Sequence, residues 1–105
     1  MVKLGSNREA SLGDFLAQAR RASELTLVEV AQRLGLKSPQ SVWDWENGKG
    51  SGIPADMLLR LVKLYRISES EAYEQLLQFH RSRAERKAHD KFEEARARFK
   101  KTGKP

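Results

Sequence analysis

The side chains that most often carry out catalysis or bind metals are few in this chain. Its two histidines are His80 and His89, and Glu85 lies four residues before His89, so a helix could bring these last two to one metal ion. The sequence offers no converging third ligand, no cysteine, no glycine-rich phosphate loop and no nucleophile with a neighbouring base. We therefore expect no enzyme activity, no metal site and no cofactor, and we interpret these side chains as solvated.

The charged residues are distributed unevenly along the chain. The formal net charge is +6 over 105 residues, a balance typical of proteins with anionic partners such as nucleic acid. Residues 1–80 contain ten basic and ten acidic side chains, whereas residues 81–105 contain ten basic and four acidic ones. The excess therefore lies in the C-terminal segment, and charge alone assigns no anionic partner to the first eighty residues.

The spacing of apolar residues predicts helices almost throughout, and no strand-like alternation is present. Ser11 with Asp14 and Thr26 with Glu29 have the spacing of capping boxes, which mark helix starts. The first predicted helix carries a stripe made of Leu12, Phe15, Leu16, Ala19 and Ala22. The second is short, ends at Gly35, and carries a stripe made of Leu27, Val30, Ala31 and Leu34.

Three further helices are predicted after Gly35. Ser38-Pro39 is a serine cap followed by proline at a first helical position, and Asn47-Gly48 ends that helix, which is followed by a flexible loop over 49–52. Pro54 opens the fourth helix, with an apolar face made of Leu58, Leu61, Val62 and Tyr65. Ser68 with Glu71 caps the fifth, in which Ala72, Tyr73, Leu76, Leu77 and Phe79 continue the core.

We divide the chain into an arm over 1–10, a compact all-α domain of five helices over 11–80, and a basic tail over 81–105 that is helical or partly disordered. A thin apolar seam follows the tail at spacings of three, four and seven: Ala84, Ala88, Phe92, Ala95 and Phe99. The seam could pack on a partner helix; the alternative is a solvated, frayed helix end, because alanines bury little area. No stretch has the apolar length of a signal peptide or membrane span, so we expect a cytoplasmic protein without membrane contact.

Two short helices joined by a turn that begins at a glycine have the layout of a helix-turn-helix. The segment from Ala10 to Gly50, followed by IPADMLLRLVKLYRIS, resembles the XRE family of lambda- and Cro-repressor-like DNA-binding domains over residues 11–79. The residues that carry this resemblance are Val30, Ala31, Leu34, Gly35, Val42, Trp45 and the run Glu46-Asn47-Gly48-Lys49. The resemblance implies a five-helix domain whose third helix, Pro39–Glu46, lies in the major groove of double-stranded DNA.

The resemblance also implies roles for individual residues on and around that helix. With Val42 and Trp45 pointing inward, the side chains offered to base edges are Gln40, Ser41, Trp43 and Asp44, and Gln40 is suited to pair with adenine. The residues offered to phosphates are Lys37, Ser38, Asn47 and Lys49. Ser38 and Ser41 could instead serve only as helix caps. Arg20 and Glu46 are expected to form a structural ion pair that fixes the reading helix.

Three residues depart from the family pattern. Trp43 is a second tryptophan next to an inward one, so it contacts a thymine methyl, the sugar-phosphate wall, a protein partner, or its own helix and loop. Asp44 is repelled by phosphates and is suited mainly to accept from cytosine, and Leu27 stands where many relatives carry a polar residue. Compensating phosphate contacts can come from Arg81, Arg83, Arg86 and Lys87 of the tail, or this basic run is a solvated face.

Two functions are therefore compared. The first is a sequence-specific, repressor-like transcriptional regulator that binds double-stranded DNA as a homodimer, with its dimer contact on the fourth and fifth helices, as the resemblance suggests. The alternative is a protein-interaction adaptor or antitoxin-type protein that binds a protein partner through Trp43 and the tail.

Overall fold

The structure, a computed structural model, describes the backbone of residues 11–102 and the side chains of residues 11–100. Its helices are α2 (Leu12–Ala22), α3 (Leu27–Leu34), α4 (Gln40–Glu46), α5 (Ala55–Tyr65) and α6 (Glu69–Thr102), and this part of the chain contains no strand. The predicted all-α fold of five helices is confirmed. The predicted arm over 1–10 lies outside the described residues.

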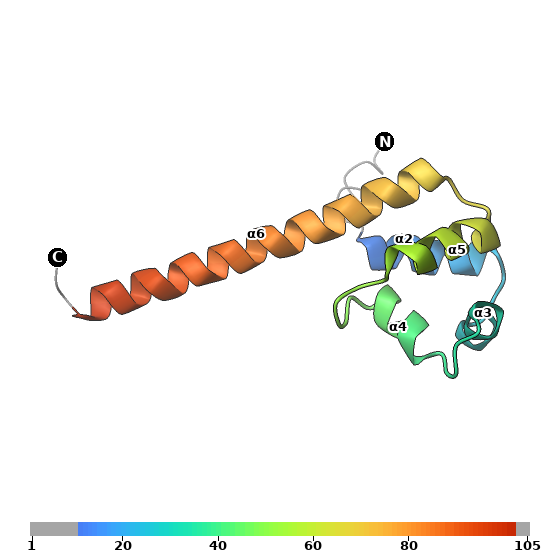
Figure 1. The fold of residues 1–105 in the computed structure, drawn as a ribbon, viewed down its shortest axis with the longest axis horizontal. Helices are drawn as coiled ribbons and strands as arrows, with labels where there is room; N and C mark the ends of the chain where they lie inside the picture. The colour runs from blue at the N-terminus through green and yellow to red at the C-terminus, as the bar shows by residue number, and fades with distance from the viewer. Residues whose placement is uncertain (1–10, 103–105) are drawn as a thin grey trace.

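The helices are arranged around α2 and α5. Figure 1 shows α6 on one side of this pair and α3 with α4 on the other. Helix α2 packs against α4, α5 and α6, and α3 packs against α4. The face of the domain formed by α3 and α4 is therefore remote from α6.

The predicted helix starts are confirmed by their caps. The Asp14 amide donates to Ser11 Oγ at 3.1 Å, and the Glu29 amide donates to Thr26 Oγ1 at 3.1 Å, each with the reciprocal bond of a capping box. The Glu71 amide likewise donates to the Ser68 hydroxyl at 3.1 Å.

The helix start predicted at Pro39 lies one residue too early. Pro39 occupies the cap of α4, and the Ser38 hydroxyl accepts only a long bond of 3.3 Å from the Gln40 amide. Helix α4 therefore begins without a strong side-chain cap.

The buried core contains the predicted stripes with a few changes. Its members are Leu12, Leu16, Val30, Ala31, Leu34, Val42, Ile53, Leu58, Leu61, Val62, Tyr65 and Ala72. Ala22 is exposed because it is the last residue of α2, where the chain turns toward α3. Tyr73 is 59% exposed because Ala72 takes the inward position, and neighbouring helical residues point about 100° apart. Trp45 is only partly buried against this core.

The tail continues the last helix of the domain without a break. Helix α6 runs for 34 residues, and all its described side chains from His80 to Lys100 are exposed. The domain and the first part of the tail therefore share one helix, whose second half projects away from the core (Figure 1). None of the helices in the described part of the chain combines the length and apolar content needed to cross a bilayer.

Candidate nucleic-acid interface

The corner between α3 and α4 is built by one glycine and three buried apolar residues. Gly35 adopts the left-handed conformation, with φ 76°, and the Leu36 amide donates to the Ala31 carbonyl at 2.8 Å. Ala31 and Leu34 of α3 are buried together with Val42 of α4. This packing leaves the opposite side of α4 at the molecular surface.

The exposed side of α4 carries most of the residues predicted to read bases. Gln40 and Ser41 are exposed, Trp43 is 41% exposed, and Asp44 is partly buried. The Gln40 Nε2 atom donates to Asp44 Oδ1 at 2.9 Å, one helical turn away. This bond holds the amide of Gln40 in one orientation and leaves its oxygen and its second amide hydrogen available.

The turn after α4 is shaped by bonds back to the helix. The Asn47 side-chain nitrogen donates to the Trp43 carbonyl at 2.8 Å, and the Lys49 amide donates to the Asp44 carbonyl at 2.9 Å. Asn47 therefore caps the end of α4 with part of its side-chain amide. Gly48 and Gly50, with φ of 68° and 71°, allow the chain to reverse at this point.

The residues predicted to contact phosphates lie at the two ends of α4. Lys37 and Ser38 precede the helix, and Asn47 and Lys49 follow it, all four with exposed side chains. A helix of 7 residues is about 10 Å long, close to the roughly 12 Å width of the major groove. The two groups therefore lie at opposite ends of α4.

An ion pair joins the end of α4 to α2. Arg20 Nε and Nη2 donate to the two carboxylate oxygens of Glu46 at 2.7 Å and 3.0 Å, and Arg20 Nη1 donates to the Leu25 carbonyl at 3.0 Å. The side chains are only 14% and 7% exposed. The hydrogen bond that Arg20 donates to Glu46 raises the pKa of Arg20 above its usual value, so the guanidinium stays charged. Such a bidentate pair fixes direction as well as distance.

Tyr65 lies near this pair, and its hydroxyl is buried without a hydrogen-bond partner. Burial, with a smaller contribution from the Glu46 carboxylate, raises the pKa of Tyr65 well above its usual value. The phenol therefore stays neutral over the physiological pH range and contributes its ring to the core.

Gly13 sets how closely α2 and α4 approach. A Cβ atom at this position would overlap the Glu46 carbonyl oxygen, and it would lie 2.8 Å from the Glu46 carbonyl carbon and 3.1 Å from the Trp45 oxygen. The sequence predictions missed Gly13, Ile53 and the buried Tyr65 hydroxyl. A glycine inside a predicted helix was the one signal that could have identified the first of these.

The first basic residues of the tail follow the part of α6 that meets the loop after α4. Arg81, Arg83, Arg86 and Lys87 are exposed on α6, and the Arg83 guanidinium lies 5.1 Å from the centre of the Phe79 ring. Gly52, in the loop that follows α4, packs against this Phe79 ring, so Arg83 lies near the loop that carries Lys49. Within the described residues, no three metal-ligating side chains converge.

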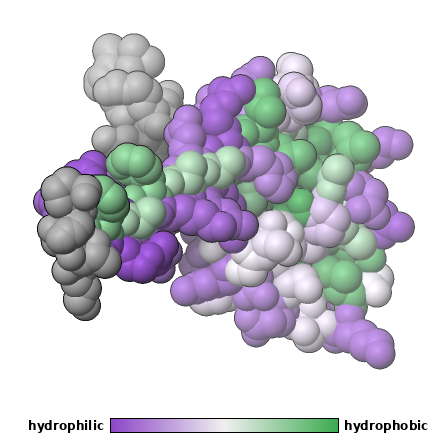
Figure 2. All heavy atoms as spheres, turned by 60° about the vertical axis from the view of Figure 1, so that its left-hand side comes forward, coloured by the Kyte–Doolittle hydropathy of each residue, from purple (hydrophilic) through white to green (hydrophobic). Residues whose placement is uncertain are grey.

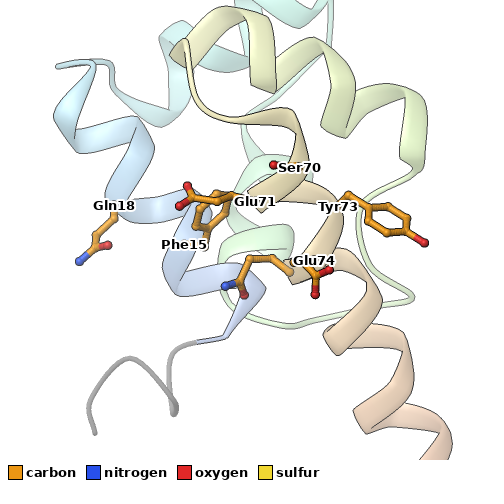
Figure 3. A pocket seen from close by; sticks show the side chains of 7 residues that line it. Phe15, Gln18, Ser70, Glu71, Tyr73 and Glu74 are labelled. Atoms are coloured by element: carbon orange, nitrogen blue, oxygen red, sulfur yellow. The ribbon is translucent and has the colours of Figure 1, made fainter. Parts of the chain in front are cut away.

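A pocket of about 570 Å³ lies between α2 and the start of α6. Figure 3 shows Phe15 of α2 beside Glu71 of α6, with Gln18 and Tyr73 pointing outward in opposite directions. Its polar rim includes Glu71 and Glu74, so it is a mildly acidic surface.

A comparison with known protein families identifies the family of this domain. The profile of the helix-turn-helix domain family matches residues 11–75. The chain belongs to the helix-turn-helix domain family. No curated protein and no solved structure is significantly similar to the chain. The match covers α2 to α5 and the first turns of α6, and it ends before the projecting half of α6.

Proposed function

We propose that this helix-turn-helix protein is a sequence-specific regulator of transcription, of the lambda- and Cro-repressor-like kind, which binds double-stranded DNA as a homodimer and reads the major groove with Pro39–Glu46. One observation carries the proposal. Helix α4 presents the exposed polar edge of Gln40 and Ser41 while its far end is fixed to α2 by the Arg20–Glu46 pair. A helix held in this way can present its side chains to base edges in one orientation.

Gln40 is the principal base-reading residue in this proposal. One hydrogen of its Nε2 atom is donated to Asp44, and the side chain is exposed, so its second hydrogen and its Oε1 atom remain as a donor and acceptor pair. That pair matches the N7 acceptor and N6 donor of adenine. Asp44 acts as a positioning residue for Gln40, which explains an acidic side chain on a helix that approaches phosphates.

The remaining contacts follow from their places around α4. Lys37, Ser38 and Lys49 bind phosphates at the two ends of the helix, together with the part of the Asn47 amide that does not cap α4. Trp43 contacts the groove wall or a thymine methyl. Arg83, near the loop that follows α4, adds a phosphate contact to this group, and the other basic residues of α6 add contacts where DNA reaches them. We further propose that the protein has no catalytic activity and needs no cofactor.

Selection of bound duplexes from a random pool, at two salt concentrations, tests the proposal. We expect an enriched motif that contains adenine at the position read by Gln40. Gln40→Ala should lower the preference for that adenine by roughly 5- to 150-fold, whereas Gln78→Ala, an exposed glutamine on α6, should leave it unchanged. Absence of any enriched motif would overturn the proposal.

The same assay distinguishes a DNA-binding regulator from a protein-interaction adaptor. Loss of all duplex binding in Trp43→Ala with an unchanged domain fold supports a groove contact for Trp43. If the wild-type chain selects no duplex, Trp43 and the tail are better explained by a protein partner. Removal of residues 81–105 should lower affinity and its dependence on salt while leaving the preferred sequence within one half-site unchanged.

A further inference from the structure

The projecting half of α6 carries an apolar stripe that continues into the domain. The seam of Ala84, Ala88, Phe92, Ala95 and Phe99 is extended toward the domain by Tyr73 and Leu77. At about 100° per residue, all these side chains fall within an arc of roughly 100° on one face of α6. Figure 2 shows this row of hydrophobic residues between hydrophilic ones along the projecting helix. Tyr73, Phe92 and Phe99 are 59%, 63% and 63% exposed.

The spacing of the stripe repeats with a period of 11 residues. Tyr73, Ala84 and Ala95 form one series, and Leu77, Ala88 and Phe99 form the other. Eleven residues in three turns correspond to 3.67 per turn, which keeps an apolar line straight or slightly right-handed along a helix. A solvated helix has no need of such a line, so the repeat indicates a partner helix along most of α6.

The stripe is also symmetric about Arg86. Tyr73 and Phe99 lie at equal separations from Arg86, as do Leu77 with Ala95 and Ala84 with Ala88. The remaining member, Phe92, has His80 as its counterpart. Two copies of α6 that run antiparallel about a two-fold axis at Arg86 therefore place large side chains at both ends and small ones in the middle.

The charges along α6 favour the same arrangement. Residues 69–80 contain Glu69, Glu71 and Glu74 and no lysine or arginine, whereas residues 81–100 contain eight basic and four acidic side chains. Antiparallel pairing places the basic end of each helix beside the acidic start of the other, including the rim of the pocket at Glu71 and Glu74. Parallel pairing would place like charges together along the whole length.

We propose that the α6 stripe is the homodimer interface, occupied by the α6 stripe of a second copy in antiparallel orientation. Helix α5 is a weaker candidate, because Leu59 is its one large apolar side chain with substantial exposure. The three exposed aromatic residues, at roughly 200 Å² each and about 60% exposed, supply about 360 Å² per copy. The total area buried by both copies must reach about 1,000 Å², the lower limit for specific interfaces. The remainder comes from the leucine, the alanines and the neighbouring lysine and arginine stems. We therefore expect a dissociation constant in the micromolar range.

This arrangement deepens the proposed function, on which its relation to DNA rests. The segment of α6 that packs on the domain is centred about twelve residues from Arg86. At 1.5 Å per residue, the two domains would be held about 36 Å apart along the helix axes. Because α4 lies on the far side of each domain from α6, the paired helices leave both reading surfaces uncovered.

Sedimentation equilibrium of the full chain, from about 1 to 200 µM in 0.3 M NaCl and without DNA, tests the interface. We expect a monomer–dimer equilibrium in the wild type. Ala88→Arg should weaken it at least tenfold, and Ala97→Arg, the same substitution on the opposite face of α6, should leave it unchanged. A wild type that stays monomeric at every concentration overturns the interface, as does equal loss in both variants.

The orientation is tested by disulfide trapping, because the chain has no cysteine of its own. Antiparallel pairing predicts that Ala84→Cys and Ala88→Cys chains bridge chiefly to each other in a mixture. Efficient bridging within each single variant would indicate parallel helices and overturn the antiparallel arrangement. A dimer that selects no DNA motif leaves the interface standing without the proposed function, whereas a monomer that binds a single half-site does the reverse.

Discussion

Replacing Gly13 by alanine tests whether the close crossing of α2 and α4 controls the reading helix. Two effects oppose each other. Alanine is a better helix former than glycine by about 1 kcal/mol, which would stabilise α2. The added methyl, however, would overlap the Glu46 carbonyl and lie 2.8 Å from its carbon, where ordinary contacts begin near 3.4 Å. The end of α4 must therefore move by roughly 0.5–1 Å, and overpacking of this kind costs about 1–3 kcal/mol.

We expect a net loss of about 1–2 kcal/mol in the free energy of unfolding for Gly13→Ala. Urea unfolding followed by the fluorescence of Trp43 and Trp45, with circular dichroism as a second probe, measures it. Gln18→Ala on the exposed side of the same helix is the matched control and should change stability by less than about 0.5 kcal/mol. A Gly13→Ala variant as stable as the wild type, or more stable, would refute the reasoning.

Three further predictions concern the elements around α4. A double-mutant cycle with Arg20→Met and Glu46→Gln should show single losses of about 2–4 kcal/mol and a double loss smaller than their sum; additive losses would contradict a direct pair. Tyr65→Phe should keep or raise stability at pH 7 by up to about 1 kcal/mol, because the hydroxyl has no partner. Since burial raises the pKa of Tyr65, only the unfolded chain loses this proton just above pH 10. Wild-type stability should therefore fall there by up to about 1.4 kcal/mol per pH unit beyond any fall in the variant, and parallel pH curves would exclude this effect. Gly35→Ala should cost about 1 kcal/mol through its φ of 76° alone, because the space around it is open, and Gly35→Asn should recover part of the loss in the same urea assay.

The sequence predicted features that depend on neighbouring residues better than features that depend on packing between helices. The capping boxes at Ser11 and Thr26 and the left-handed Gly35 follow from local chemistry, and the structure contains all three. The inward position of Tyr73 was wrong, because a helical stripe does not indicate which of two adjacent apolar residues meets the core. The role of Gly13 depends on the path of α4, which no local pattern specifies.

The roles of the α4 side chains divide in the same way. Their exposure followed from the inward positions assumed for Val42 and Trp45. The bond from Gln40 to Asp44 is an i, i+4 contact and could have been expected from spacing, yet the acidic residue was interpreted only as a candidate base reader. The position of Arg83 near the loop after α4 was beyond prediction, because it depends on the packing of Gly52 against Phe79.

The projecting half of α6 has a consequence for proteolysis of the chain and for its net charge. The described side chains of this half are exposed, and an isolated helix of about twenty residues is only marginally stable in water. Its amide hydrogens should exchange far faster than those of the core, and proteases should cut it while the domain stays folded. Cleavage after His80 would turn a chain of formal charge +6 into a domain with ten basic and ten acidic residues. One proteolytic event would thus change the electrostatics of the protein without altering the surface of α4.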